Sequence, residues 1–214
     1  SGINYSEIIT MKIIDGLKLK GAPAEIPDCS RDDLPQFFKD MGYRVGVEIG
    51  TFKGDFALLL CKAGLKLYAI DPWKDYSDYH RDSAWQKELD GIHEQTKKLL
   101  ALYDCEILRK SSMEMVNTFA DESLDFVYID GNHSFKYVVE DIFEWSKKVK
   151  KGGVISGHDY IYIRRKGFDE IHVKFVVDAY TKAFGIDNWY VLGSKAAQKG
   201  EKRDTSRSWM WIKK

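Results

Sequence analysis

The sequence contains no long apolar run, no GxGxxG motif and no metal-like spacing among its cysteines. A membrane-spanning helix needs about 20 mostly apolar residues, and no signal-peptide pattern is present either, so we expect a soluble protein. Dinucleotide-dependent dehydrogenases carry GxGxxG, and its absence argues against that class. The odd number of cysteines (Cys29, Cys61 and Cys105) argues against a disulfide framework and predicts a reducing, cytoplasmic setting.

There is also no excess of charge of either sign. Lys plus Arg and Asp plus Glu number 33 each, so the overall charge gives no reason to expect a nucleic-acid or membrane partner. Internal repeats and low-complexity tracts are absent from the sequence. At 214 residues the chain is long enough to bury a sizeable core without disulfides or metals.

The most informative stretch is the apolar run at 45–49 and the glycine-bearing turn that follows it. Gly50 and Gly54 carry no Cβ, so the backbone can bend tightly there and approach a ligand closely. Glu48 stands two places before the first glycine, and Asp55 suits the positive end of the next helix. The stretch predicts a central buried strand, a turn and a helix.

Short apolar strands alternate with amphipathic helices along the chain. We expect further strands at 67–71, 106–108, 124–130 and 154–159, and helices at 5–17, 30–42, 56–63, 83–103, 134–150 and 168–184. Segments 189–192 and 208–212 predict a closing antiparallel pair. The pattern predicts an α/β fold with a doubly wound, Rossmann-like sheet, mostly parallel with an antiparallel C-terminal strand and helices on both faces. We expect one domain over 1–214, with an N-terminal helical segment at 1–42 and the Rossmann-like core at 43–214.

Acidic residues and a histidine stand at the ends of several predicted strands, namely Glu48, Asp71, Asp130 and the pair His158-Asp159. The carboxyl ends of parallel strands meet at one edge of the sheet, which is where such folds bind ligands. Like charges brought together cost free energy unless a cation, a hydroxyl or a metal meets them. These residues therefore predict a binding site at that edge.

Four motifs carry a resemblance to a known family: VEIGTFKG at 47–54, AIDPW at 69–73, IDGNHSF at 129–135 and GVISGHDY at 153–160. Their combination, order and spacing resemble class I S-adenosylmethionine-dependent methyltransferases, and within them the small enzymes related to catechol and macrolide-sugar O-methyltransferases. The resemblance covers about residues 45–160. It implies methyl transfer from S-adenosylmethionine to a small molecule or sugar, most simply to an oxygen atom.

The resemblance also implies a set of cofactor-binding residues. The glycine turn would pass under the methionine part, supported by Glu48, and Asp71 would accept both ribose hydroxyls. Trp73 would stack on adenine, and Asp130 would lie near the sulfonium. The full implied set is Glu48, Gly50, Thr51, Phe52, Gly54, Asp71, Pro72, Trp73, Ser112, Met113 and Asp130.

Several of these residues have a purely structural alternative. Glu48 could serve only as a cap or a lysine partner, and Asp71 could simply end a strand before a proline. A tryptophan such as Trp73 is as often a core residue as a cofactor wall. Ser112 and Met113, implied to lie along the adenine edge, could only cap the next helix.

On the acceptor side, the resemblance implies magnesium held by an Asp after the fourth strand and an Asp-Asn pair after the fifth. Asp130 matches the first position, but His158-Asp159 departs from the pair. Magnesium prefers oxygen ligands, so His158 weakens the magnesium interpretation or indicates another divalent metal. The candidate metal ligands are Asp130, His158 and Asp159. The candidate catalytic residues are Asp130, His133, His158 and Asp159, with either histidine as the base that deprotonates the acceptor.

Two segments border this edge and could contact the acceptor: 76–81 as a lid, and the basic run at 164–166 as a site for an anionic group. Solvated loops are the alternative for both. Two other functions stay open, namely N-methylation, which needs no strong base, and a cofactor-binding module without transfer activity. A homodimer through the tryptophan-rich closing strand and the N-terminal apolar helices is a further hypothesis.

Overall fold

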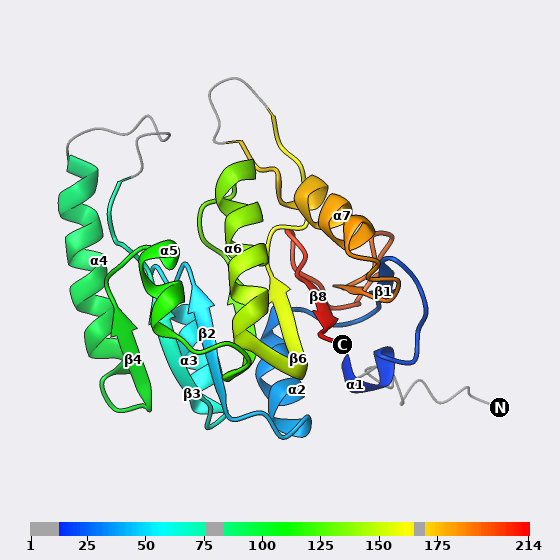
Figure 1. The fold of residues 1–214 in the computed structure, drawn as a ribbon, viewed down its shortest axis with the longest axis horizontal. Helices are drawn as coiled ribbons and strands as arrows, with labels where there is room; N and C mark the ends of the chain where they lie inside the picture. Colours follow the sequence, from blue (N-terminus) through cyan, green and yellow to red (C-terminus); the bar gives the residue numbers. More distant parts are fainter. Residues whose placement is uncertain (1–12, 76–83, 165–169) are drawn as a thin grey trace.

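The computed structural model describes residues 13–75, 84–164 and 170–214 (Figure 1). Its strands form an eight-stranded sheet in the order β1-β7-β8-β6-β5-β2-β3-β4. Their bounds are β1 Ala24–Ile26, β2 Val45–Ile49, β3 Lys66–Ile70, β4 Cys105–Leu108, β5 Leu124–Ile129, β6 Val149–Gly157, β7 Tyr190–Leu192 and β8 Trp209–Ile212.

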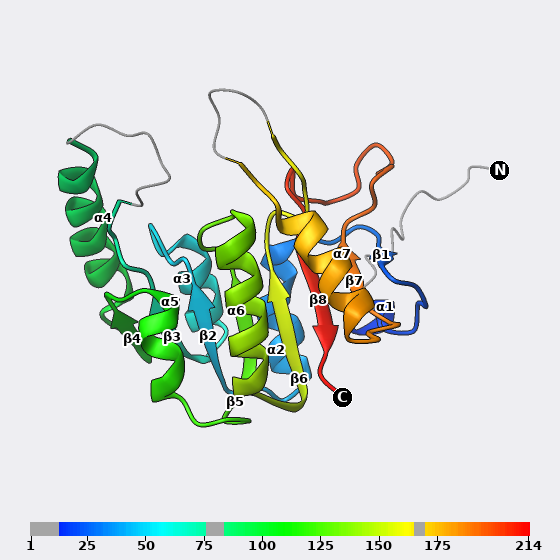
Figure 2. The same cartoon turned by 45° about the horizontal axis from the view of Figure 1, so that its top comes forward.

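The sheet is mostly parallel. The pairs β2·β3, β2·β5, β3·β4, β5·β6 and β1·β7 are parallel, whereas β8 runs antiparallel to both β6 and β7. In Figure 2 the arrowheads of β2 and β6 point to one edge of the sheet and that of β8 points to the opposite edge. The predicted Rossmann-like sheet with an antiparallel C-terminal strand is confirmed.

Helices cover both faces of the sheet, as the doubly wound pattern predicts. α6 and α7 lie on one face, and α2 and α3 on the other (Figure 2). The helical bounds are α1 Ile13–Gly16, α2 Leu34–Asp40, α3 Asp55–Lys62, α4 Ala84–Leu100, α5 Ser112–Met115, α6 Phe135–Lys148 and α7 Val173–Ala183, with 3-10 turns at Arg31–Asp33 and Val116–Thr118. Among the helices described, none has the length and apolar character that crossing a bilayer requires.

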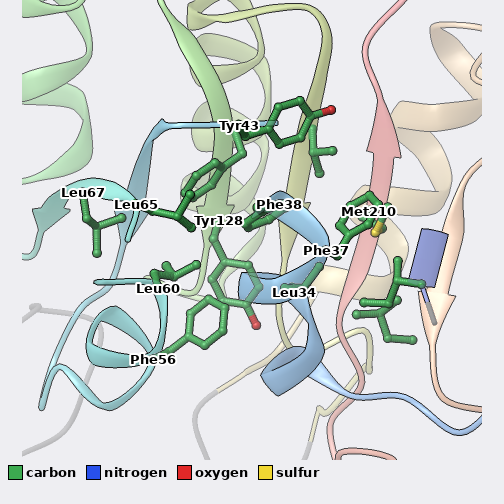
Figure 3. Close-up of a cluster of buried hydrophobic side chains, with 14 of the residues drawn as sticks. Leu34, Phe37, Phe38, Tyr43, Phe56, Leu60, Leu65, Leu67, Tyr128 and Met210 are labelled. Atoms are coloured by element: carbon green, nitrogen blue, oxygen red, sulfur yellow. The ribbon is translucent and has the colours of Figure 1, made fainter. Parts of the chain in front are cut away.

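Aromatic side chains fill the layer between the sheet and α2 and α3. Phe38 stacks on Phe126 with ring centroids 4.2 Å apart. Phe56 packs against Tyr128 with ring centroids 4.3 Å apart (Figure 3). A Cβ at Gly46 would lie 2.3 Å from the Phe126 ring, so this β2 glycine makes room for that ring. The layer fixes β2 and β5 side by side, which positions the ends of these strands.

Three sequence-based expectations differ from the structure. Segment 24–26, expected as a loop within a helical N-terminal region, is the edge strand β1, whose main chain pairs with β7. The helix expected to reach residue 150 ends at Lys148, because β6 begins at Val149 and pairs with Leu124 across a register shift. The tryptophan-rich strand β8, expected to close the sheet, lies inside it between β6 and β7. The expected helix at 5–17 falls mostly outside the described residues.

Gly50, directly after β2, lies where two backbones approach closely. Its φ is +89°, and a Cβ there would lie 2.1 Å from the carbonyl oxygen of Asp130. A side chain is therefore opposed both by the left-handed conformation and by the end of β5. Gly64 has a similar φ of +84° but open space around it, which makes it a matched control.

We expect Gly50→Ala to lower the free energy of unfolding more than Gly64→Ala. Both substitutions incur the left-handed cost of about 1–2 kcal/mol, but only Gly50→Ala adds an overpacking cost of about 1–3 kcal/mol. Urea unfolding followed by circular dichroism measures both losses. Equal losses would mean that the Asp130 backbone shifts freely and that the close approach is not a constraint.

Candidate functional site

A cavity of about 490 Å³ opens beyond the carboxyl ends of β2, β3 and β5. The chain leaves β2 toward β3 and β4 on one side, while β5 and β6 lie on the other, so this is the point where the strand order reverses. The volume is in the range of small-molecule sites. The polar side chains in its lining belong to Lys74, Asp71, Ser112, Asp130, Asn132, His133 and Asp141.

Most of the implied cofactor-binding residues border this cavity, namely Gly50, Phe52, Asp71, Pro72, Trp73, Ser112 and Asp130. Glu48, Thr51, Gly54 and Met113 do not. Of these four, Met113 packs on the apolar layer under α6 and α7, and Gly54 takes a left-handed φ of +80° at the N-cap of α3. The lid residues 76–81 and the basic residues 165 and 166 lie outside the described residues.

Asp71, at the end of β3, has its carboxylate fixed by two backbone amides. The N–H groups of Phe52 and Trp73 donate to its two oxygens at 2.9 and 2.7 Å. Burial raises the pKa of Asp71, and the two amide hydrogen bonds oppose that rise. The carboxylate is thus held in one orientation at the cavity wall, with lone pairs left to accept ligand hydroxyls.

Trp73 is a core residue. It is 0% exposed, its ring packs 4.6 Å from His93, and its indole Nε1 donates to the carbonyl of Phe52 at 2.9 Å. Although the residue borders the cavity, a fully covered indole presents no open face on which a base could stack. The structure therefore favours the core alternative over the adenine-stacking one.

Glu48 does not reach the cavity edge, contrary to expectation. Because side chains alternate along a strand, it points with Gly46 toward α2 and α3, and it is 2% exposed. Its Oε2 has no hydrogen-bond partner. Burial raises the pKa of Glu48 to about 8, and the carboxylates of Asp130 and Asp71 add to the rise. The Glu48 side chain is therefore a neutral acid at pH 7.

Asp130 and Asp159 are brought together with His133, as the sequence predicts. His133 Nε2 lies 3.3 Å from Asp130 Oδ1 and 3.0 Å from Asp159 Oδ2. Burial alone would lower the pKa of His133, but the two carboxylates outweigh it and raise the pKa to about 10. Arg31 Nη1 lies 3.3 Å from the other oxygen of Asp130. At neutral pH two cations therefore balance the two acids.

The candidate ligand atoms that lie together differ by one residue from the predicted set. His158 Nδ1 lies 3.5 Å from Asp159 Oδ1 and 3.9 Å from Asp130 Oδ1. The ligand atoms that lie together, within 4.8 Å of one another, belong to Asp130, His133 and Asp159. His133 thus takes the place expected of His158, because it projects from the loop after β5 between the two carboxylates.

Residues of the site that were not predicted include Arg31, Asn132, Asp141 and Asp204. Asn132 Oδ1 accepts from the Ser134 N–H at 2.9 Å, and its buried Nδ2 has no partner. Asp204, in the β7–β8 connection, accepts from the Arg31 N–H at 2.9 Å. Asp141 could have been found, because it is an acid on the otherwise apolar face of the predicted helix at 134–150.

A family model described as a methyltransferase domain matches residues 47–160, more than half of the chain. The chain belongs to this methyltransferase family. The matched segment holds all four motifs and all of the residues that line the cavity, and the predicted membership of the class I S-adenosylmethionine-dependent methyltransferases is confirmed.

Solved structures share the fold of this methyltransferase. The O-methyltransferase TomG from Streptomyces achromogenes, in complex with SAM, has a TM-score of 0.59 at 16% identity, covering 86% of this chain and 79% of that one. An O-methyltransferase from Bacillus cereus in complex with SAH has a TM-score of 0.56 at 16% identity, covering 86% and 80%. An rRNA methylase from Streptococcus thermophilus has a TM-score of 0.56 at 15% identity, covering 84% and 93%. At these identities the likeness shows the fold alone.

Among curated proteins, the uncharacterized protein y4gI of Sinorhizobium fredii is 25% identical over 130 residues. The match takes in 57% of this chain but only 14% of that much longer protein.

We expect the stability of the protein to fall as pH rises from about 4.5 to 8, because of Glu48. The folded state keeps the Glu48 proton across that range while the unfolded chain loses it, so the unfolded state is favoured progressively. Glu48→Gln should remove this dependence of stability on pH. The variant should be more stable than the wild-type protein by up to about 4 kcal/mol at pH 8.5, and the two should differ little at pH 5. Urea unfolding at both pH values measures the effect. The exposed Glu106→Gln is the control, and the same pH slope in both variants would contradict a buried neutral Glu48.

Proposed function

We propose that this methyltransferase transfers a methyl group from S-adenosylmethionine to an oxygen of a small-molecule acceptor, in the cytoplasm. One observation carries the proposal: a single cavity at the strand-order reversal is bordered by Asp71 on one side and by Asp130 and His133 on the other. The first is suited to a ribose and the second to a hydroxyl that must lose its proton.

The cavity fits an S-adenosyl nucleoside. Apolar side chains of Ile49, Ile70 and Leu89 line it together with carboxylates, which suits a ligand that has a flat base, a sugar and a cation. Asp71 would accept the ribose hydroxyls, and the turn at 50–54 would pass beside the methionine part. Asp130 would lie near the positively charged sulfur. When bound, the nucleoside supplies an electrophilic methyl group, and the protein aligns the acceptor with it.

The two histidines are the candidate bases that would remove the proton of the acceptor hydroxyl. With a pKa raised to about 10, His133 is protonated at neutral pH while it is paired with both carboxylates. It becomes a base only when the acceptor replaces those ion pairs and favours the neutral imidazole, whereas with a cation bound at Nε2 it would be a ligand and no longer a base. His158 is the second candidate base, and its Nδ1 lies 3.5 Å from Asp159 Oδ1.

The cluster of Asp130, His133 and Asp159 suits a divalent cation. Two carboxylates and an imidazole offer one nitrogen and several oxygens, a donor set more typical of manganese, iron or zinc than of magnesium. These three residues would hold the ion, and its chemistry would be to lower the pKa of an acceptor hydroxyl. An acceptor that is a sugar or carries an anionic group remains a prediction for this side of the cavity.

Two alternatives give different measurements. An N-methyltransferase would need no base, so substitution of His133 and His158 would leave transfer to an amine intact. A cofactor-binding module would bind S-adenosylmethionine but methylate nothing. Incubation with labelled S-adenosylmethionine and a panel of hydroxylated and amine acceptors separates these outcomes.

We expect Asp71→Asn to weaken binding of S-adenosylmethionine by roughly 10- to 100-fold, because the ribose loses charged hydrogen bonds. Isothermal titration calorimetry, with and without magnesium, measures the affinity. The remote, exposed Asp187→Asn is the control. Near-UV circular dichroism checks that the Phe52 turn, which Asp71 also holds, keeps its structure. Unchanged affinity in a folded Asp71→Asn variant would refute the placement of the ribose.

We expect Mn²⁺ to bind the wild-type protein and His133→Gln to weaken that binding more than His158→Gln. The reason is that only His133 places a nitrogen between both carboxylates, and loss of one ligand typically weakens a metal site by at least tenfold. Calorimetric titration of Mn²⁺ measures all three proteins. A larger loss in His158→Gln would restore the ligand set expected from the sequence.

A further inference from the structure

Asp159 has a backbone conformation that aspartate rarely adopts. Its φ is +51°, in the left-handed region, which is disfavoured by roughly 5- to 30-fold for a residue with a Cβ. In this conformation Asp159 Oδ2 lies 3.0 Å from His133 Nε2. Such strain persists only where the surrounding structure enforces it, so the residues on both sides of Asp159 must be held firmly.

The residue before Asp159 is fixed by the sheet. The N–H of His158 donates to the carbonyl of Ile129 at 3.0 Å. The carbonyl of His158 accepts from Trp209 Nε1 at 3.0 Å. These hydrogen bonds fix where the chain enters Asp159, but they do not fix where it leaves.

The residue after Asp159 is fixed by α7. Tyr160 is 6% exposed, and its ring lies edge-on to that of Trp189 with centroids 5.4 Å apart. Its hydroxyl donates to Asp178 Oδ1 at 2.5 Å and accepts from Lys174 Nζ at 3.3 Å. Lys174 also forms an ion pair with Asp178. An ion pair on the helix surface would explain Lys174 and Asp178 alone, but here both also hold the hydroxyl of a buried side chain.

This network lies apart from the proposed cofactor site. Tyr160, Lys174 and Asp178 border a separate cavity of about 470 Å³ beside α7. Among the described residues, this cavity and the one at the strand-order reversal share no lining residue. An influence of the network on the cluster around His133 must therefore pass through the backbone between Tyr160 and Asp159.

We propose that Tyr160 and Asp178 are positioning residues for Asp159. By fixing the residue that follows it, they keep Asp159 left-handed and hold its carboxylate against His133. Without them Asp159 would relax to a commoner backbone conformation, and its carboxylate would turn away from the imidazole. The inference rests on the proposed function, because it takes the cluster that contains Asp159 to act on the acceptor.

The first test uses the metal-free protein. Tyr160→Phe keeps the packed ring but removes the hydroxyl, and we expect it to shift the imidazole ¹⁵N NMR signals of His133 at pH 7. The reason is that the Asp159 carboxylate would leave the ring nitrogen. His133→Gln identifies the signals. Asp187→Asn, a change to another acid that borders the same cavity, is the control and should leave them unchanged.

The second readout is the affinity for Mn²⁺, measured by calorimetry. If Asp159 relaxes, the conformation that binds a cation is populated less, and the affinity falls by the same factor. We expect Tyr160→Phe to weaken Mn²⁺ binding by roughly 5- to 30-fold and to leave the affinity for S-adenosylmethionine unchanged. A merely structural role would lower the melting temperature but change neither the His133 signals nor the Mn²⁺ affinity of the folded protein.

A second variant covers the case in which Tyr160→Phe does not fold. Asp178 has a partly exposed side chain on α7, and Asp178→Asn should shift the His133 signals in the same way. Unchanged signals in a folded variant would refute the positioning role, whether or not the wild-type protein binds Mn²⁺. A wild-type protein that binds no S-adenosylmethionine would refute the proposed function, while the His133 signals would still decide the positioning role.

Discussion

The site depends on how the peptide groups of one residue, Phe52, are held. Its φ of +47° is left-handed, and its N–H donates to Asp71 at 2.9 Å. Its carbonyl accepts from Trp73 Nε1 at 2.9 Å and from Thr96 Oγ1 at 2.8 Å. The end of β3, the segment after it and α4 thus all fasten the turn that follows β2. Because Asp71 accepts one of these hydrogen bonds, the carboxylate suited to a ribose is held at a fixed position relative to the turn suited to the methionine part.

The fold brings several acids near one edge of the sheet and stabilises them in three different ways. Asp71 accepts hydrogen bonds from two backbone N–H groups. Asp130 and Asp159 are met by cationic side chains. Burial raises the pKa of Glu48 to about 8, so this acid keeps its proton at pH 7, and it raises the pKa of Asp141 to about 7, so this acid loses its proton within the neutral range. These acids can therefore lie near one another without a large repulsion between carboxylates. Each of them differs from the others in its hydrogen bonds, its ion pairs or its pKa.

The strand ends could be predicted from sequence because they depend on local pattern. Apolar runs that end in an acid identify β3 and β5, and the parallel order brings those ends together. The direction of a single side chain depends on neighbours that pattern does not show. The indole of Trp73 turns into the core because α4 offers Leu89 and Ile92 as partners. Glu48 could have been placed correctly, since strand alternation puts it opposite Val47 and Ile49, which face α6.

Arg31 and Asp204 could not have been predicted, because they come from opposite ends of the chain and neither belongs to a periodic pattern. The backbone N–H of Arg31 donates a hydrogen bond to Asp204, and the Arg31 guanidinium forms an ion pair with Asp130. Both lie outside the segment 47–160 that the methyltransferase family shares. The matched segment contains every residue that lines the cavity, and the N-terminal flanking segment reaches Asp130 through Arg31. Family membership therefore identifies methyl transfer, and the N-terminal flanking segment adds a cation, Arg31, beside Asp130.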